Sequence, residues 1–289
     1  KYLFWFHNHS GQTFRDRNPV WISGGVKKDG KIYWSQPEIL LYDPDPDVRI
    51  SYPDLIQEDG KYWITETQKS IARVHRVSSG LLEGLWQQGR VRKVTQEGRA
   101  VSLHGKAADG GSTEMPNLPD LSEGGGFSVG TWVKLQSLEP GQIVLDSQSQ
   151  EGAGILVRTA ENKALELVMS DGEHTSSWTT DPGLLSAAEP HHVVYIVDGA
   201  SNILSVLVDG RLCDGGRHRQ YGWTRFNGEL GDVSGAASLK LAPDLQGDLL
   251  RVRVYDRYLR TSEAIANYNA DARSIEGLEP VGITPGSSR

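Results

Sequence analysis

The sequence predicts an all-β protein. Short runs rich in Val, Ile, Tyr, Phe and Trp recur along its 289 residues, and such runs are typical of strands. Asp-Gly and Gly-Gly pairs separate many of them, as in hairpin turns. Only residues 261–268 (TSEAIANY) have a clear helical pattern, with Thr261 as the expected N-cap.

The first 86 residues form one predicted region. Short strands at this spacing, joined by tight turns, indicate antiparallel sheets such as propeller blades. Residues 78–89 are expected to contain at most a short turn of helix, and 87–94 to be a connector. The strands are expected at 3–6, 20–23, 31–34, 38–42, 54–57, 61–66 and 70–77.

A second β region follows the connector. Its alternating, β-branched strands predict a β-sandwich over residues 95–270. The Gly/Pro/Ser-rich residues 271–289 are expected to be a loosely held tail. The sandwich strands are expected at 127–135, 142–147, 153–159, 164–170, 191–198, 203–210, 237–242 and 248–256.

Composition narrows the classes of partner. A net charge of −7 argues against nucleic acid as the main partner. No apolar run approaches the roughly 20 residues that span a bilayer, so we expect no membrane partner. Cys213 is the single cysteine and excludes an internal disulfide. The chain starts inside a strand-like run without Met, so we expect its natural start to lie upstream. The oligomeric state is not predicted.

The second region carries ordered motifs. It resembles the laminin-G-like, concanavalin-type jelly roll over about residues 95–270. Such sandwiches bind glycans or brace a neighbouring domain, and the fold alone does not decide between these roles. The motifs are FSVGTWVKL (127–135), HHVVYIVDG (191–199), LSVLVDGRL (204–212) and GDLLRVRVYDRYLRTSEAIANY (247–268).

Tryptophans are the sandwich's candidate sugar contacts. Trp178 and Trp223 lie in looser, polar stretches, where an indole face can stack on a sugar ring. Trp132 and the pair His191 and His192 fall in strand patterns and are expected to pack instead. The sequence therefore predicts substrate binding by Trp178 and Trp223.

No cofactor is expected, although a structural calcium ion stays open in the sandwich. Calcium prefers oxygen ligands on one rim of such domains, but aspartates in β turns mostly form turns. The candidates are Asp146, Asp171, Asp209 and Asp248.

The first region carries a second resemblance. Its motifs follow one another in a fixed order: RNPVWI (17–22), WSQPEILL (34–41), SYPDL (51–55) and then an Asp-Gly turn before a strand ending in Glu66. This run resembles the last part of a sialidase-type β-propeller. The resemblance implies that Arg17 is the last carboxylate-binding arginine and that Tyr52 is the nucleophile. It also implies that two more arginines, the acid/base aspartate and the glutamate that activates the tyrosine lie upstream of this chain.

The sequence departs from that family in two places. KKDGKIYW puts four steps between Gly30 and Trp34, where the family's Asp-box has three. Pro53 follows Tyr52, where serine is common. In addition, 86 residues make only about two blades, whereas a propeller needs at least four.

Other residues of the first region are further candidates. Glu66 is a candidate acid near the same blade. Arg49, just before Tyr52, and His7 and His9 in the HNH run are candidate substrate contacts. Two histidines without a third ligand make a weak metal signal, so no metal site is expected. The ordinary alternatives are an aromatic strand residue for Tyr52 and solvated surface charges for the others.

These observations predict the C-terminal part of an exo-acting, sialidase-like glycoside hydrolase with an accessory carbohydrate-binding or bracing jelly roll. This chain alone would lack a complete active site. A glycan is the expected partner, and an extracellular or periplasmic bacterial location is expected. One alternative is a five-bladed glycosidase acting on arabinan, xylan or fructan, which would use two carboxylates from earlier blades. The other is a non-catalytic glycan-binding or structural module.

Overall fold

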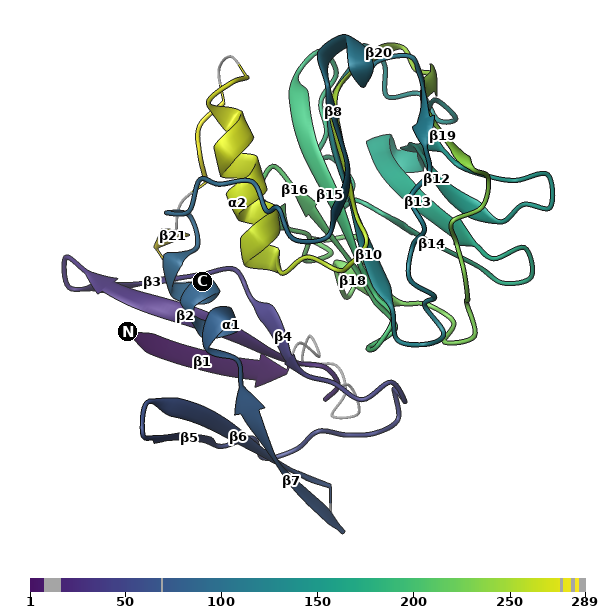
Figure 1. The fold of residues 1–289 in the computed structure, drawn as a ribbon. Helices are drawn as coiled ribbons and strands as arrows, with labels where there is room; N and C mark the ends of the chain where they lie inside the picture. Colours follow the sequence, from purple (N-terminus) through teal and green to yellow (C-terminus); the bar gives the residue numbers. More distant parts are fainter. Residues whose placement is uncertain (8–16, 69, 276–277, 282–283, 286–289) are drawn as a thin grey trace. The chain divides into compact units, whose positions relative to one another are not determined.

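The computed structural model describes residues 1–7, 17–68, 70–275, 278–281 and 284–285. It confirms an all-β protein, with two compact units (Figure 1). Unit 1 comprises residues 1–94 and 260–289, and unit 2 comprises residues 95–259. The sequence placed residues 260–270 in the sandwich domain, whereas their contacts group them with the first unit.

Unit 1 contains two open antiparallel sheets. In one, β1, β2, β3 and β21 are neighbours in that order, and β4 pairs with β2. In the other, β5, β6 and β7 follow in chain order. The described residues thus show sheets and no closed ring of blades. The strands are β1 (Tyr2–His7), β2 (Val20–Lys28), β3 (Lys31–Trp34), β4 (Glu38–Leu41), β5 (Leu55–Glu58), β6 (Lys61–Gln68), β7 (Ile71–Val77) and β21 (Thr284–Pro285).

Helix α1 (Ser79–Gln87) packs on β2 and corrects the expectation of a mere turn. Its apolar residues recur at helical spacing, and Leu82, Leu85 and Trp86 are buried. Gly24 of β2 makes the close approach geometrically feasible, because a Cβ there would lie 2.8 Å from the Leu85 Cβ. The core of this unit holds nine buried apolar residues among those described: Val20, Ile22, Leu41, Ile50, Ile64, Val77, Leu82, Leu85 and Trp86.

Helix α2 (Thr261–Ala272) is the helix expected from the sequence, but the expected N-cap is wrong. Thr261 is the first helical residue, and a distant carboxylate caps the helix instead. Glu38 accepts hydrogen bonds from the amides of Thr261 and Ser262, both at 2.9 Å, and from the Ser262 hydroxyl at 2.9 Å. Burial raises the pKa of Glu38 above its ordinary value, and these three bonds offset part of that rise.

The tail is held more firmly than the sequence suggests. Asn269 of α2 donates to the Val281 carbonyl at 3.0 Å and accepts from the Val281 amide at 2.8 Å. The Tyr268 hydroxyl donates to the Glu279 carbonyl at 3.1 Å. Residues 279–281 are therefore fastened to the helix.

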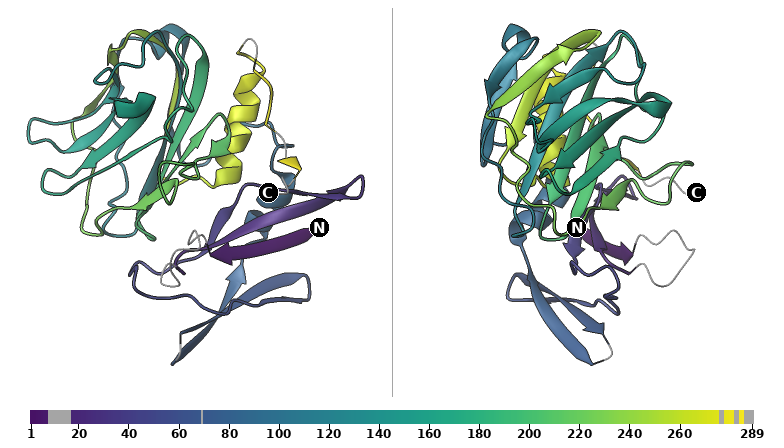
Figure 2. Two further views of the ribbon diagram at one scale, coloured as in Figure 1. Left: turned by 180° about the vertical axis from the view of Figure 1, so that it is seen from behind. Right: turned by 90° about the vertical axis from the view of Figure 1, so that its right-hand side faces the viewer.

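Unit 2 is a β-sandwich (Figure 2). One sheet has the order β17-β16-β15-β10-β20-β8, with β18 beside β16, and the other has β14-β13-β12-β11-β19-β9. The strands are β8 (Arg99–His104), β9 (Gly111–Glu114), β10 (Gly126–Leu135), β11 (Ile143–Asp146), β12 (Gly154–Ala160), β13 (Ala164–Ser170), β14 (Thr175–Thr179), β15 (Pro190–Asp198), β16 (Ile203–Val208), β17 (Arg211–Leu212), β18 (Trp223–Arg225), β19 (Ser238–Asp244) and β20 (Gly247–Tyr255).

The sandwich core lies between the two sheets. Alternate residues of β10, such as Phe127 and Val129, belong to this core cluster, in agreement with the two-residue period of a strand. All eight strands expected in this region are present. Three short strands were missed: β8, β9 and β14, which are polar or poorly alternating. Short β17 and β18 were also not separated from their loops.

Candidate functional site

Tyr52 has an unusual backbone conformation. Its φ is +50°, in the left-handed region, which is an outlier for a bulky residue. Its side chain is 79% exposed, whereas nearby Ile50 is buried in the core at 1%. Such a conformation costs roughly 1–3 kcal/mol and persists only where the surroundings hold it. Tyr52 is therefore not an ordinary strand residue.

Hydrogen bonds to β6 fix the backbone on both sides of Tyr52. The Thr67 amide donates to the Ser51 carbonyl at 3.0 Å. The Asp54 amide donates to the Thr65 hydroxyl at 3.1 Å, and the Thr65 amide donates to the Asp54 carbonyl at 2.9 Å. The residue between these anchors has little freedom to relax.

Two side chains from elsewhere add to these anchors. The Trp5 indole donates to the Pro53 carbonyl at 3.1 Å. Arg17 Nη1 donates to the Ser51 hydroxyl at 3.2 Å. The structure thus brings Arg17, predicted to bind a carboxylate, next to the segment that presents Tyr52. A guanidinium suits that task because its planar fork matches a carboxylate.

The remaining first-region candidates lie less closely together. Arg49 is exposed, three residues before Tyr52. His7 is half-buried at the end of β1, opposite Val20 in the register. His9 lies outside the described residues. The structure does not join these residues to Tyr52 through any contact it describes.

Glu66 is placed differently from Tyr52. It is 4% exposed on β6, and its Oε1 accepts from Arg73 Nη1 at 3.1 Å and lies 2.9 Å from His75 Nε2. Arg73 and His75 both belong to β7, so these contacts fasten the two strands. The alternative of a solvated surface charge does not hold for Glu66, which is buried on the central strand of its sheet. Its catalytic role stays a prediction.

Trp178 and Trp223 meet at one edge of the sandwich. Trp178 is on β14 and Trp223 on β18, so both belong to short strands rather than loops. The Trp178 indole donates to the Gly222 carbonyl at 3.1 Å, one residue before Trp223. Tyr221 stacks on Trp223 with ring centroids 4.7 Å apart. The sequence missed Tyr221, although it stands two residues from Trp223.

Arg219 covers one face of Trp178. Its guanidinium carbon lies 4.0 Å from the ring centroid, a cation–π contact. Asp181 holds this guanidinium in an ion pair and also accepts the Asp214 and Gly215 amides at 3.0 and 2.9 Å. One face of Trp178 is thus occupied. Tyr221 likewise covers one face of Trp223, and both rings of this pair are half-exposed.

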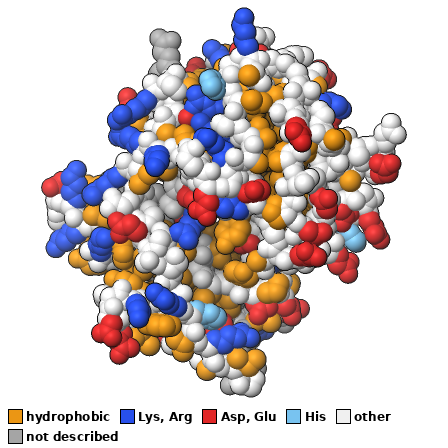
Figure 3. Space-filling view, viewed as in Figure 1, with side chains coloured by type: hydrophobic (Ala, Val, Ile, Leu, Met, Phe, Trp, Pro, Cys, Tyr) orange, Lys and Arg blue, Asp and Glu red, His pale blue; other side chains and the backbone are white. Residues whose placement is uncertain are grey.

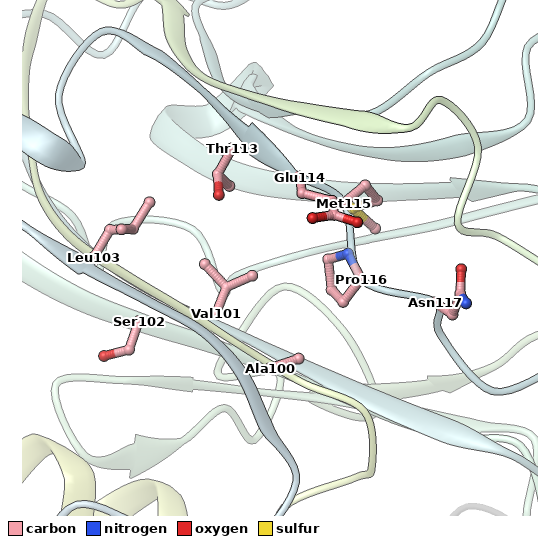
Figure 4. Close-up of a pocket in the computed structure, with 9 residues that line it drawn as sticks. All are labelled: Ala100, Val101, Ser102, Leu103, Thr113, Glu114, Met115, Pro116 and Asn117. Atoms are coloured by element: carbon pink, nitrogen blue, oxygen red, sulfur yellow. The ribbon is translucent and has the colours of Figure 1, made fainter.

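The opposite edge of the sandwich is hollowed between β8 and β9 (Figure 4). The cavity measures about 400 Å³ and is lined by residues 100–103 and 113–117. These nine residues include no aromatic side chain. This cavity therefore lacks a stacking platform for a sugar ring.

Three of the four aspartates named for calcium have separate partners. Asp146 pairs with Lys240 at 2.8 Å, and Asp209 lies 2.8 Å from His191 Nδ1. Asp171 accepts the amides of residues 173, 174 and 231; burial acts to raise its pKa, but these bonds outweigh it and lower the pKa. Within the described residues, no group of three or more His, Cys, Asp or Glu side chains could hold a metal ion.

No helix that the structure describes is both long and apolar enough to cross a bilayer.

Comparison with protein families identifies the sandwich. The Laminin_G_3 model, described as the concanavalin A-like lectin/glucanases superfamily, matches residues 107–266. The chain belongs to this superfamily. The expected laminin-G-like, concanavalin-type jelly roll is thereby confirmed. No curated protein matches the sequence.

Several solved structures are similar at low identity. The CBM40 of a Ruminococcus gnavus IT-sialidase, bound to alpha2,6 sialyllactose, is 15% identical with a TM-score of 0.44, over 59% of this chain and 100% of that one. A Trypanosoma rangeli sialidase in complex with sialic acid is 14% identical with a TM-score of 0.40, over 87% of this chain and 53% of that one. This chain spans about half the length of that sialidase.

The binding domain of botulinum neurotoxin serotype D is also similar. It is 10% identical with a TM-score of 0.42, over 64% of this chain and 53% of that one. At such values these similarities do not transfer a function.

Proposed function

We propose that this chain is the C-terminal part of an exo-acting, sialidase-like glycoside hydrolase and that Tyr52 is its nucleophile. Residues 1–86 would supply the last blades of the propeller. The observation that supports this is the conformation of Tyr52: an aromatic side chain with a positive φ, largely exposed, between anchored neighbours. Residues held in strained conformations by their surroundings cluster at active sites.

The chemistry explains why a tyrosine would serve. Most retaining glycosidases use a carboxylate nucleophile, and sialidases use tyrosine. A sugar that carries a carboxylate at the reacting carbon repels an anionic nucleophile but not a neutral phenol. The phenol is weak at its usual pKa of about 10, so it needs a base within hydrogen-bond reach. In this proposal the rest of the enzyme supplies that base and the acid that protonates the leaving group.

Arg17 is the proposed partner of the substrate carboxylate. It is half-buried and bonded to Ser51, so it lies at a fixed place next to the Tyr52 segment. In the full-length enzyme, we expect Arg17→Lys to raise KM for a sialoside by at least about tenfold, because a lysine cannot make the paired bonds of a guanidinium. An unchanged KM would remove Arg17 from the site.

The test of the nucleophile is Tyr52→Phe in the full-length enzyme, assayed with a fluorogenic aryl sialoside. We expect a loss of at least about 1,000-fold in kcat. Tyr42→Phe is the matched control, since Tyr42 is another exposed tyrosine of the same unit. Near-normal turnover by Tyr52→Phe would contradict the assignment. Hydrolysis of an arabinan, xylan or fructan that is indifferent to Tyr52 would favour a five-bladed glycosidase instead.

We further propose that the sandwich binds glycan at the aromatic edge formed by Tyr221 and Trp223. The supporting observation is that the two rings stack while remaining half-exposed. Trp223→Ala should weaken binding of the cognate oligosaccharide at least about tenfold, since a stacked aromatic contributes on the order of 1 kcal/mol or more. Tyr258→Ala, a change at an exposed aromatic of the same unit, should not. Equal affinity of both variants would leave the sandwich a bracing role.

A further inference from the structure

We propose that Ser186, His191 and Asp209 form a second hydrolytic site on the sandwich, which cleaves short-chain acyl esters such as those on sugar hydroxyls. The three residues lie in unit 2 and share no residue with the Tyr52 site. This activity does not depend on the glycosidase proposal.

The three side chains are joined in the order of a nucleophile, a base and an orienting carboxylate. Ser186 Oγ lies 2.9 Å from His191 Nε2. His191 Nδ1 lies 2.8 Å from Asp209 Oδ2. Both distances are those of hydrogen bonds. A nucleophile-activating triad is recognised by this geometry and not by the order of its residues in the chain.

The surroundings fix the tautomer that a base requires. The Ser186 amide also donates to His191 Nε2, at 3.0 Å. An amide N–H can only donate, so Nε2 is the acceptor and the proton of the neutral ring sits on Nδ1. That proton points to the Asp209 carboxylate. The imidazole is thus held with its lone pair on the nitrogen nearest the Ser186 hydroxyl.

Asp209 is itself held in place. Its Oδ1 accepts the His192 amide at 2.8 Å, and its own amide donates to the His192 carbonyl at 2.8 Å. It opens the tight Asp-Gly turn between β16 and β17, with φ +49°. A rotation of the carboxylate away from His191 would therefore also break its bond from the His192 amide.

The side chains of the base and the nucleophile differ in exposure, as an acyl-transfer site requires. The His191 side chain is 12% exposed, which shields the base, whereas Ser186 is exposed and accessible to a substrate. Asp209 is partly covered. A buried base with an accessible hydroxyl is the arrangement expected of an acyl-transfer site.

A hollow beside the residue that follows Ser186 suggests the substrate class. Ala187, the residue after Ser186, lines a hollow of about 390 Å³ together with Leu138, Pro140 and Ala160. The apolar part of this hollow suits a short acyl group such as acetyl. Asn162, Lys163 and the acidic Glu139 and Glu161 also line it.

The proposed reaction balances without a further reagent. Ser186 Oγ attacks the acyl carbonyl carbon as its proton passes to His191 Nε2. The C–O bond to the alcohol breaks, and the alcohol leaves with that proton. Water then attacks the acyl-serine, again through His191, to release the carboxylic acid and restore the hydroxyl. Asp209 stabilises the imidazolium in both halves.

The first test is covalent labelling of the whole chain with a fluorophosphonate, alongside hydrolysis of p-nitrophenyl acetate. We expect one adduct, located at Ser186, and turnover that falls at least about 100-fold in Ser186→Ala and His191→Gln. Ser238→Ala, a change at an exposed serine of the same unit, is the control and should behave like wild type. Absence of the adduct, or wild-type turnover in Ser186→Ala, would overturn the proposal.

Asp209 is a positioning residue and needs a separate readout. Asp209→Asn should lower kcat at least about tenfold while KM stays within twofold, because the carboxamide no longer holds the ring in the basic tautomer. An unchanged far-UV spectrum and melting temperature would show that the hairpin persists. If kcat keeps its wild-type value in that folded variant, the relay through Asp209 is refuted.

Discussion

The two units differ in the number of apolar side chains that they bury and expose. The sandwich encloses a single cluster of 32 buried apolar residues between two sheets, counted over the described part of the chain. The first unit, on the same basis, has a cluster of nine. Among the ten most exposed large apolar side chains that the structure describes, eight belong to unit 1 and only Leu184 and Tyr258 to unit 2. Apolar side chains at the surface are visible in Figure 3.

The difference is that unit 2 keeps most of its large apolar side chains inside, whereas the sheets of unit 1 expose several of theirs. The sandwich encloses its core cluster between its own two sheets. Unit 1 leaves Phe4, Ile56, Ile71 and Val74 in solvent. The propeller proposal requires that such side chains contact further protein in the full-length enzyme.

The largest expected effect tests the independence of the sandwich core. Phe127→Ala removes a fully buried ring of that core and should cost about 3–5 kcal/mol of its stability. Unfolding in denaturant, followed by hydrogen exchange, should show the loss in β10, β15 and β20 and leave β1 to β7 unchanged. An equal loss of protection in β1 to β7 would mean that the two units unfold together.

A medium effect is expected at the tight contact inside unit 1. Gly24→Ala places a methyl group 2.8 Å from the Leu85 Cβ, and such overpacking typically costs about 1–3 kcal/mol. Hydrogen exchange should show the loss in α1 and β2 and not in the sandwich. Gly30→Ala is the contrasting control, because open space surrounds its Cβ but its φ is +76°, so any loss there reports backbone strain alone. Wild-type stability of Gly24→Ala would show that α1 shifts freely.

A smaller effect of opposite sign is expected at Tyr52. Glycine adopts a positive φ without strain, so Tyr52→Gly should be stabilising by about 1 kcal/mol while abolishing the proposed glycosidase activity. Tyr42→Gly, at an exposed tyrosine for which no positive φ is recorded, should instead be neutral or destabilising. Chemical unfolding of both variants measures the difference. Destabilisation of Tyr52→Gly would show that the ring itself supports the fold.

The smallest effect concerns pH. Burial raises the pKa of Glu38, so the folded state holds its proton more readily than the unfolded chain. The stability from this group is complete below the ordinary carboxyl pKa of about 4.3 and is lost as pH rises through the folded pKa. Glu38→Gln should remove that slope from unit 1, whereas Glu58→Gln, at an exposed carboxyl, should keep it. A slope of the opposite sign would mean that the bonds from α2 outweigh burial.

Local pattern predicted the strands well, because alternation and turn residues act over a few residues at a time. It predicted less well the features that depend on residues far apart in the sequence. Helix α1 was underestimated because Gly80 and Gly84 lower its intrinsic propensity, whereas packing against β2 stabilises it. The cap of α2 was assigned to Thr261, since nothing near it in sequence indicates Glu38.

The candidate sites were predicted in the same uneven way: local motifs were found, whereas contacts between distant residues were not. The order of motifs predicted that Tyr52 and Arg17 belong to one site, and in the structure Arg17 is hydrogen-bonded to Ser51, next to Tyr52. His191 was expected only to pack, because its partners Ser186 and Asp209 become visible as a set only when β15 and β16 pair. A hydrogen-bonded triad of this kind has no signature in sequence spacing.

The cap that Glu38 places on α2 has a consequence for the order of synthesis. Unit 1 is discontinuous, because the 165 residues of 95–259 separate its two segments. On the ribosome, Glu38 therefore emerges long before the amides that donate hydrogen bonds to it, and the sandwich is fully made before α2 appears. Because domains fold as units during synthesis, the sandwich can reach its native fold before helix α2 of unit 1 has been made. A nascent chain that stops before residue 260 would leave a carboxylate with no helix to cap.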